Sequence, residues 1–176
     1  FHSKAIVEGI PAEFRDPANR YFVDAYRARV IYYAKARVQP SELSGYENLA
    51  DPKWKGRICI RPGSHDYNLA LFGQFMVSYG EAKAKVIMAG LSNNLARTPK
   101  GNDREQAKGI FEGKCDVALM NTYYHALMAN TPEQKPWADA TAVFYPDQAG
   151  KGAFIMRSAS GMTKADGNRD LAQQFL

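Results

Sequence analysis

Two hydrophobic periods alternate along the chain. Apolar runs of strand length are separated by windows in which apolar residues recur every three or four positions, as they do on a helix. The first kind of pattern predicts strands near residues 26–34, 56–60, 115–119, 141–145 and 152–157. Because helical windows fill the gaps between them, the sequence predicts an α/β fold. We expect a largely parallel or mixed central sheet flanked by helices.

The helix that follows the second strand is the clearest. Ser64 or Asp66 can cap its start, and Gly80 supplies its end. One apolar stripe joins Leu69, Leu71, Phe72, Phe75, Met76 and Tyr79. A second helix is predicted over residues 81–96.

Two further helices lead toward and away from the third strand. The first begins after residues 101–103, where Asp103 and Gln106 have the spacing of a capping box, and it ends at Gly113. The second covers residues 122–128, with Asn121 as its expected N-cap. The proline- and glycine-containing segments 132–136 and 148–152 are predicted to be surface loops.

Three tyrosines stand at two strand-to-helix junctions. Tyr67 lies in the first turn after the second strand, and Tyr123 and Tyr124 lie in the first turn after the third. Ligands of open parallel sheets bind beyond the carboxyl ends of the strands, where such junctions collect. Adjacent residues in a first helical turn are only about 100° apart, so both can reach one atom. Composition alone would produce roughly half a Tyr-Tyr pair, and the second pair, Tyr32-Tyr33, is expected to be structural.

Three converging phenolates would form a ligand set for ferric iron. A tyrosine ordinarily titrates near pH 10, so only a strong cation displaces its proton at neutral pH. Hard oxygen donors also disfavour metals that prefer thiolates. The helix N-termini at these junctions favour an anion beside the metal. Arg27 and Arg29 lie two apart on a predicted strand and share one face, which makes them candidates to hold that anion.

Composition and charge exclude other classes of protein. The 176 residues carry a formal charge of +5, but the 23 basic residues are scattered among 18 acidic ones, which argues against nucleic-acid binding. Apolar runs stay below the roughly 18 to 20 residues of a membrane span, so we expect a soluble protein. Cys59 and Cys115 fall in predicted buried strands, where they either pack as thiols or, in an oxidising compartment, form a disulfide.

Five sequence runs resemble one family. Residues 27–31, 49–56, 61–68, 94–101 and 121–124 look like the second lobe of bacterial periplasmic ferric-ion-binding proteins, the substrate-binding components of iron ABC transporters. This resemblance spans nearly the whole chain. It implies one lobe of a class II periplasmic binding protein, similar to a transferrin lobe. Residues 1–176 are then expected to form a single α/β lobe without the family's N-terminal lobe, and both ends are expected to be edges of a fragment.

The resemblance also implies roles for individual residues. Tyr123 and Tyr124 match the family's paired iron-binding tyrosines, and Tyr67 matches the third tyrosine of the subgroup that binds iron with carbonate or without an anion. Arg27 and Arg29 match the strand whose arginine holds the synergistic anion, and the resemblance leaves open which of the two does so. Asn121 matches an anion-binding asparagine of phosphate-using members. Asn102 is a weaker anion candidate that is expected to be a cap.

The sequence therefore predicts a binding protein and no enzyme. We expect it to capture Fe³⁺, with carbonate as a possible companion, in the periplasm and to pass it to an inner-membrane ABC permease as a soluble monomer. The alternative is a protein of the same fold that binds a small anion such as phosphonate or sulfate without metal. His65 and His125 flank the tyrosines but are expected to be loop or helix-face residues. The sequence offers no cluster that would activate water for hydrolysis.

Overall fold

The computed structural model describes residues 4–18, 20–165 and 167–175. The chain divides into two compact units, residues 27–155 and residues 1–26 with 156–176. The smaller unit contains α1 (Lys4–Gly9), a 3-10 turn (Ala12–Phe14) and α7 (Arg169–Phe175). The larger unit contains β2, β3, β4 and most of the helices, whereas β1 and β5 continue into the smaller unit. The extent of the predicted single lobe over residues 1–176 stays a prediction.

The central sheet is mixed. Its strands are β1 (Phe22–Ala34), β2 (Ile58–Cys59), β3 (Val117–Asn121), β4 (Thr141–Phe144) and β5 (Phe154–Ser160). They follow the order β2-β3-β1-β4, and β5 also pairs with β1. The β2–β3 pair is parallel, whereas β1 runs antiparallel to both β3 and β4. The α/β class is confirmed, but parallel pairs do not dominate, because the long strand β1 lies between β3 and β4 in the opposite direction.

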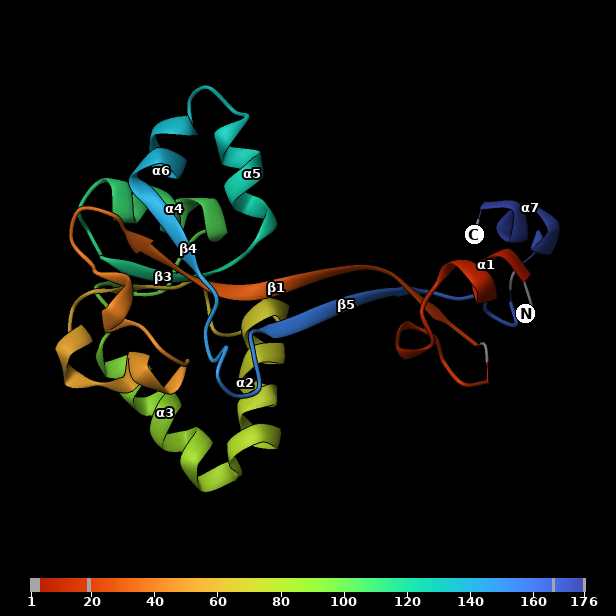
Figure 1. Cartoon of the computed structure of the whole chain (residues 1–176), viewed down its shortest axis with the longest axis horizontal. Helices are drawn as coiled ribbons and strands as arrows, with labels where there is room; N and C mark the ends of the chain where they lie inside the picture. Colours follow the sequence, from red (N-terminus) through yellow and green to blue (C-terminus); the bar gives the residue numbers. More distant parts are fainter. Residues whose placement is uncertain (1–3, 19, 166, 176) are drawn as a thin grey trace. The chain divides into compact units, whose positions relative to one another are not determined.

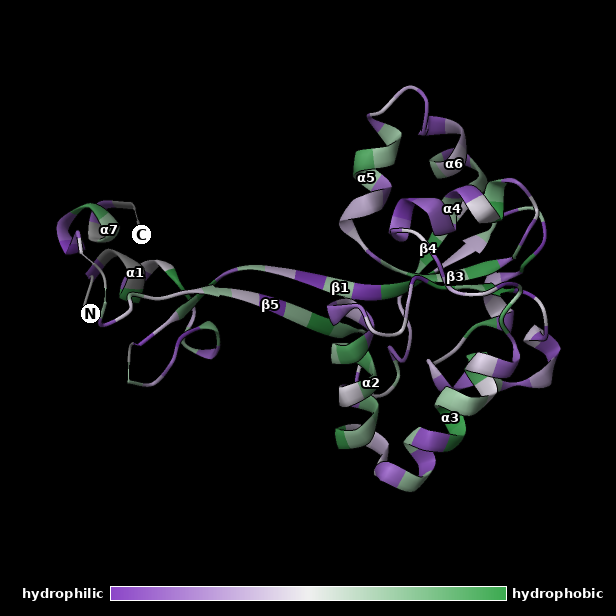
Figure 2. Cartoon of the chain, turned by 180° about the vertical axis from the view of Figure 1, so that it is seen from behind, coloured by the Kyte–Doolittle hydropathy of each residue, from purple (hydrophilic) through white to green (hydrophobic). Residues whose placement is uncertain are grey.

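Helices cover both faces of this sheet. The helices α2 (Asp66–Tyr79) and α3 (Glu81–Asn93) lie on one face, and α4 (Asp103–Phe111), α5 (Tyr123–Ala129) and α6 (Lys135–Ala140) lie on the other (Figure 1). Alternate residues of the strands divide between these layers. Ile31 and Leu119 belong to the core beside α2 and α3, while Tyr32 and Met120 belong to the core beside α4 to α6. Figure 2 shows the apolar residues along β3 between the two layers.

The connections contain short helical elements that the sequence pattern did not predict. Residues 132–136 were expected to form a loop, but α6 begins at Lys135 with Pro136 in its first turn. Proline is tolerated there because the first-turn N–H groups have no intrahelical partner. Three 3-10 turns, Pro40–Glu42, Glu47–Ala50 and Pro52–Trp54, connect β1 to β2. Among the described residues, none of the helices has the length and apolar character that crossing a membrane requires.

A disulfide joins β2 to the segment just before β3. Cys59 in β2 is bonded to Cys115, two residues before β3, and both side chains are buried. The bond therefore closes a loop of 56 residues that contains α2, α3 and α4. Of the two alternatives for these cysteines, the structure has the disulfide.

Removal of this bond should destabilise the protein. In the chain-entropy account, cross-linking a loop of this length lowers the entropy of the unfolded chain and so stabilises the folded state by about 4 kcal/mol. Measured effects are typically about 2–4 kcal/mol. We expect the double variant Cys59→Ala/Cys115→Ala to lose about 2–4 kcal/mol of unfolding free energy in urea titrations. The reduced wild-type protein serves as a control that retains both sulfur atoms. Equal unfolding midpoints for the oxidised and reduced wild-type protein would contradict this prediction.

Candidate metal centre

The structure brings tyrosines from two distant segments together. Tyr67 is the second residue of α2, and Tyr123 and Tyr124 are the first two residues of α5. The hydroxyl oxygens of Tyr67 and Tyr123 lie 3.3 Å apart although 56 residues separate them in the chain. The ring centroids of Tyr123 and Tyr124 are 4.2 Å apart. All three side chains are partly accessible to solvent. The arrangement places several phenol oxygens where one cation could contact them.

The surroundings raise the pKa of two of these phenols, Tyr67 and Tyr123. The pKa of Tyr67 is raised, mainly by the hydrogen bond of Tyr67 with Tyr123 and to a lesser extent by partial burial. The positive charge of Arg27 acts in the opposite direction. Burial, followed by a hydrogen bond with Tyr124, raises the pKa of Tyr123. Hydrogen bonds from Tyr67 and Asn121 act in the opposite direction on the Tyr123 pKa. A metal ion that uses these phenolates must therefore displace their protons.

The first turn of α2 is fixed by its neighbours. His65 is the N-cap, because its Nδ1 accepts a hydrogen bond of 3.2 Å from the Tyr67 backbone N–H. The predicted caps, Ser64 and Asp66, do not have this role. The buried Asn68 side chain donates to the carbonyl oxygens of residues 61 and 62, at 2.9 and 3.2 Å. These contacts hold the loop before α2 against the turn that carries Tyr67.

The start of α5 is supported from below by β1. Tyr32 is fully buried, and its hydroxyl donates to the carbonyl oxygens of Asn121 and Thr122, at 3.2 and 3.1 Å. Asn121 is the last residue of β3 and not the predicted N-cap, a position that Thr122 occupies. The His125 ring lies 6.2 Å from the Tyr32 ring. The structural role expected for Tyr32 is thus confirmed. Its hydrogen bonds hold the backbone just before α5 and so help to position Tyr123 and Tyr124.

One buried carboxylate connects both junctions. Asp103, the first residue of α4, is fully buried and accepts hydrogen bonds from Arg29 Nη1, Arg61 Nη1 and the Asn121 backbone N–H, at 2.5, 3.2 and 2.9 Å. Arg29 also donates to Asn121 Oδ1 and Asn68 Oδ1, at 3.2 and 2.8 Å. This network therefore links β1, β3 and α4 to the loop before Tyr67.

The sequence analysis missed most of this network. Asp103 was expected to open a capping box with Gln106, but the cap of α4 is Asn102, whose partner is Glu105. The cap role expected for Asn102 is thereby confirmed. Arg61 and Asn68 were not singled out, since each is a single polar residue near a helix start and sequence spacing does not reveal burial. The one signal that could have revealed these residues is a polar position among positions that are otherwise predicted to be buried.

Three guanidinium groups surround the Tyr67 ring. The ring centroid lies 5.6 Å from Arg27 Cζ, 5.7 Å from Arg29 Cζ and 4.9 Å from Arg61 Cζ. Arg29 is fully buried, whereas Arg27 is partly exposed. The local excess of positive charge favours phenolate oxygens and other anions at this place. Among the described residues, His, Cys, Asp and Glu side chains do not gather in a group of three that could hold a metal ion.

The chain matches a known family of bacterial proteins in sequence and in fold. Residues 3–176 match the family described as bacterial extracellular solute-binding proteins. The chain therefore belongs to this family. Its relatives include Iron uptake protein A1 of Synechocystis, which is 40% identical over 176 residues.

Several solved structures are similar to this chain, and their names also refer to iron. The ferric binding protein from Campylobacter jejuni matches with a TM-score of 0.94 and 35% identity, over 99% of this chain and 56% of that protein. A Trichodesmium protein in complex with iron and citrate matches with a TM-score of 0.91 and 40% identity, over 99% of this chain and 56% of that one. The match to the Synechocystis protein covers 99% of this chain and 49% of that protein. The chain thus spans about half the length of the curated relatives that it matches.

Loss of the buried carboxylate should be costly. Asp103→Asn leaves Arg29 and Arg61 without a countercharge, and breaking a buried ion pair in this way typically costs about 3–5 kcal/mol. We expect a loss of that size in the unfolding free energy measured by denaturant titration. The matched control is Asp139→Asn, because Asp139 forms an exposed ion pair with Lys135 that should contribute less than about 1 kcal/mol. Similar losses in the two variants would contradict the structural role assigned to Asp103.

Proposed function

We propose that the chain captures ferric iron through the phenolates of Tyr67, Tyr123 and Tyr124. The observation that carries this proposal is the 3.3 Å separation of the Tyr67 and Tyr123 hydroxyls, which come from different helices and are held in place by buried contacts. Phenolates are hard, anionic oxygen donors, and three of them balance the charge of Fe³⁺. The names of the relatives, which refer to iron uptake and ferric binding, support the same cargo over a metal-free anion.

The anion that accompanies the metal belongs beside Arg27. Carbonate is our candidate, following the resemblance to family members that have the third tyrosine. The Nη1 and Nη2 atoms of Arg29 already donate to Asp103, Asn121 and Asn68 inside the core. Arg27 is partly exposed, and its Cζ lies 5.6 Å from the centroid of the Tyr67 ring. We therefore assign the anion contact to Arg27 and a positioning role to Arg29 and Asn121.

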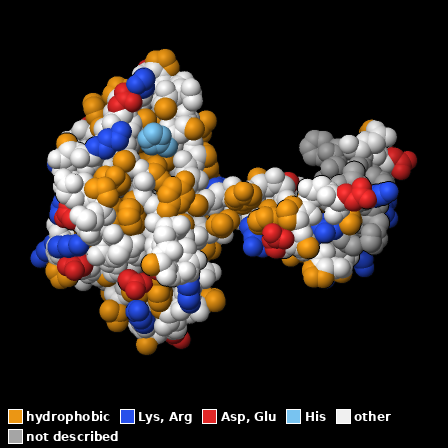
Figure 3. Space-filling view, in the orientation of Figure 1, with side chains coloured by type: hydrophobic (Ala, Val, Ile, Leu, Met, Phe, Trp, Pro, Cys, Tyr) orange, Lys and Arg blue, Asp and Glu red, His pale blue; other side chains and the backbone are white. Residues whose placement is uncertain are grey.

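The protein acts by capture and release, without catalysis. In this proposal it delivers iron to an ABC permease of the inner membrane and works in the periplasm as a soluble monomer. The extracellular solute-binding family and the disulfide, which persists in oxidising compartments, support that location. Positive and negative side chains are interspersed on the face seen in Figure 3, which fits the expectation that nucleic acid is not a partner.

Single phenylalanine substitutions test the ligand set. Ferric phenolate absorbs visible light, so titration of the purified protein with a ferric chelate should produce a charge-transfer band. Tyr67→Phe, Tyr123→Phe and Tyr124→Phe should each weaken iron binding by more than about 100-fold, beyond the typical cost of losing an outer-shell partner. Tyr145→Phe, at an exposed position in the same unit, is the matched control and should bind as the wild type does. A colourless wild-type titration would refute the proposal.

Acid should weaken iron binding steeply. The raised pKa values of Tyr67 and Tyr123 mean that protons compete with the metal, and this competition grows as the pH falls. Release of about three protons per ferric ion predicts an affinity loss of up to about 10³-fold per pH unit below neutrality. Competition titrations against nitrilotriacetate, corrected for the chelator's own protonation, measure this slope. Tyr67→Phe should release about one proton fewer, so an unchanged slope in that variant would exclude Tyr67 as a ligand.

A further inference from the structure

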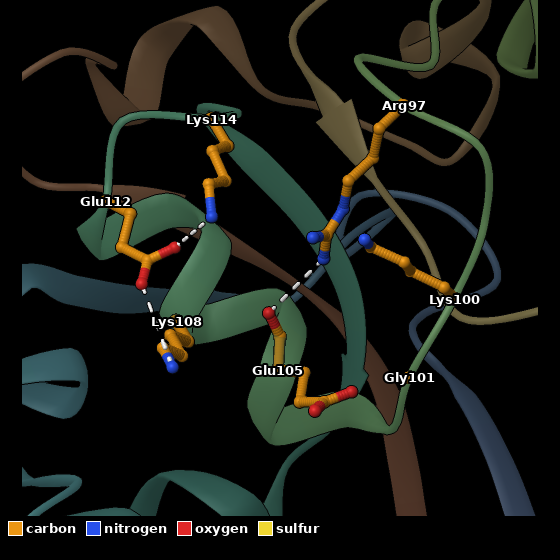
Figure 4. A pocket seen from close by; sticks show the side chains of 7 residues that line it. All are labelled: Arg97, Lys100, Gly101, Glu105, Lys108, Glu112 and Lys114. Atoms are coloured by element: carbon orange, nitrogen blue, oxygen red, sulfur yellow. Dashed lines mark hydrogen bonds and ion pairs between the residues drawn. The ribbon is translucent and has the colours of Figure 1, made fainter.

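A charged pocket lies on the outer side of α4, away from the tyrosines. It has a volume of about 310 Å³, within the range of small-molecule sites. Its walls come from the loop that ends at Gly101, from α4 and from the turn that follows α4 (Figure 4). Four of its side chains are basic, namely Arg97, Lys100, Lys108 and Lys114, and two are acidic, namely Glu105 and Glu112. None of these residues belongs to the tyrosine site.

The carboxylates of both acidic residues already have partners in the pocket wall. Glu112 pairs with Lys114 at 2.5 Å and with Lys108 at 3.8 Å. The Glu105 carboxylate accepts from the Asn102 backbone N–H at 3.2 Å as part of the cap of α4. The acids therefore leave part of the positive charge uncompensated.

That remaining charge lies on Arg97 and Lys100. Arg97 Nη2 donates only to the neutral oxygens Gln106 Oε1 and the Glu105 carbonyl, at 3.1 and 3.4 Å. Within the described part of the chain, neither Arg97 nor Lys100 forms an ion pair, and Arg97 Nε is buried without a hydrogen-bond partner. Figure 4 shows the guanidinium and the ammonium turned toward the same region of the pocket. Two cations that approach one another in this way favour an anion between them.

The wall that carries these cations is preformed. Gln106 is fully buried, and its Nε2 donates to the carbonyl oxygens of Lys100 and Asn102, at 2.7 and 2.8 Å. Its Oε1 accepts from Arg97. One buried amide thus fixes both the loop backbone and the guanidinium, so little conformational entropy would be lost when a ligand binds.

We propose that this pocket is a second anion site, which takes a small oxyanion with two or more negative charges. Inorganic phosphate and a polycarboxylate such as citrate share this chemistry and both fit the volume. The site is independent of the proposed iron site, because it uses another face of α4 and none of the tyrosines.

Binding of each anion to the metal-free protein tests this proposal by calorimetry. Lys100→Gln should weaken binding by about 2- to 10-fold, as expected for the loss of one hydrogen-bonded contact from an exposed side chain. Glu112→Gln should tighten binding, since it releases Lys108 and Lys114 from their acidic partner. Lys85→Gln, which removes the same charge from an exposed position on α3, is the matched control and should leave binding unchanged. The anion that binds more tightly identifies the source, phosphate or polycarboxylate.

Three outcomes would overturn the proposal. One is the lack of saturable binding of either anion below about 10 mM. A second is an equal effect of Lys100→Gln and Lys85→Gln, which would indicate general attraction to a basic surface. The third is binding that Arg27→Gln abolishes and Lys100→Gln preserves, which would place the anion beside the tyrosines.

Discussion

The arrangement of the site depends on the buried ion pair between Arg29 and Asp103. Neither charge has access to water, so each requires its partner and further hydrogen bonds to be tolerated in the core. The ion pair holds the start of α4 against β1. Asp103 also accepts hydrogen bonds from Asn121 at the end of β3 and from Arg61 in the loop before α2, so these two segments are held at the same place. A pair of this kind adds little net stability compared with an apolar core, but it specifies how the segments meet. The tyrosine junctions are two of those segments.

The chemistry of the site follows from charge balance. Hydrogen bonding and burial raise the pKa values of Tyr67 and Tyr123 and so favour the neutral phenols, even though three guanidinium groups lie close to the Tyr67 ring. A trivalent cation reverses this preference, because it is the strongest local charge. The excess positive charge of the arginines then remains available for an accompanying anion. Capture of the metal, loss of protons and recruitment of an anion are therefore coupled events in the proposed function.

The helix α4 has two distinct faces. Its buried side contributes Asp103, which accepts from the Asn121 backbone N–H, and Gln106, which holds the preceding loop in place. Its exposed side contributes Lys108 and Glu112 to the basic pocket. This helix lies within the loop that the buried disulfide closes, so the disulfide restricts the conformations of the segment that carries both faces. One short helix therefore contributes to both proposed binding sites.

The sequence by itself determined the elements and the ligand candidates. Hydrophobic periodicity located α2, α3, α4 and α5 to within a few residues, and the junction positions of Tyr67, Tyr123 and Tyr124 singled out these residues as candidate metal ligands. Only the tertiary structure decided the direction of β1, the helix at Lys135–Ala140, the cap at His65 and the network around Asp103. Periodicity reports which side of an element is apolar, and it carries no information about which distant polar group a buried charge will meet. The tyrosines were recognisable because their residue type states their chemistry, whereas Asp103, Arg61 and Asn68 acquire their roles from burial and long-range contacts alone.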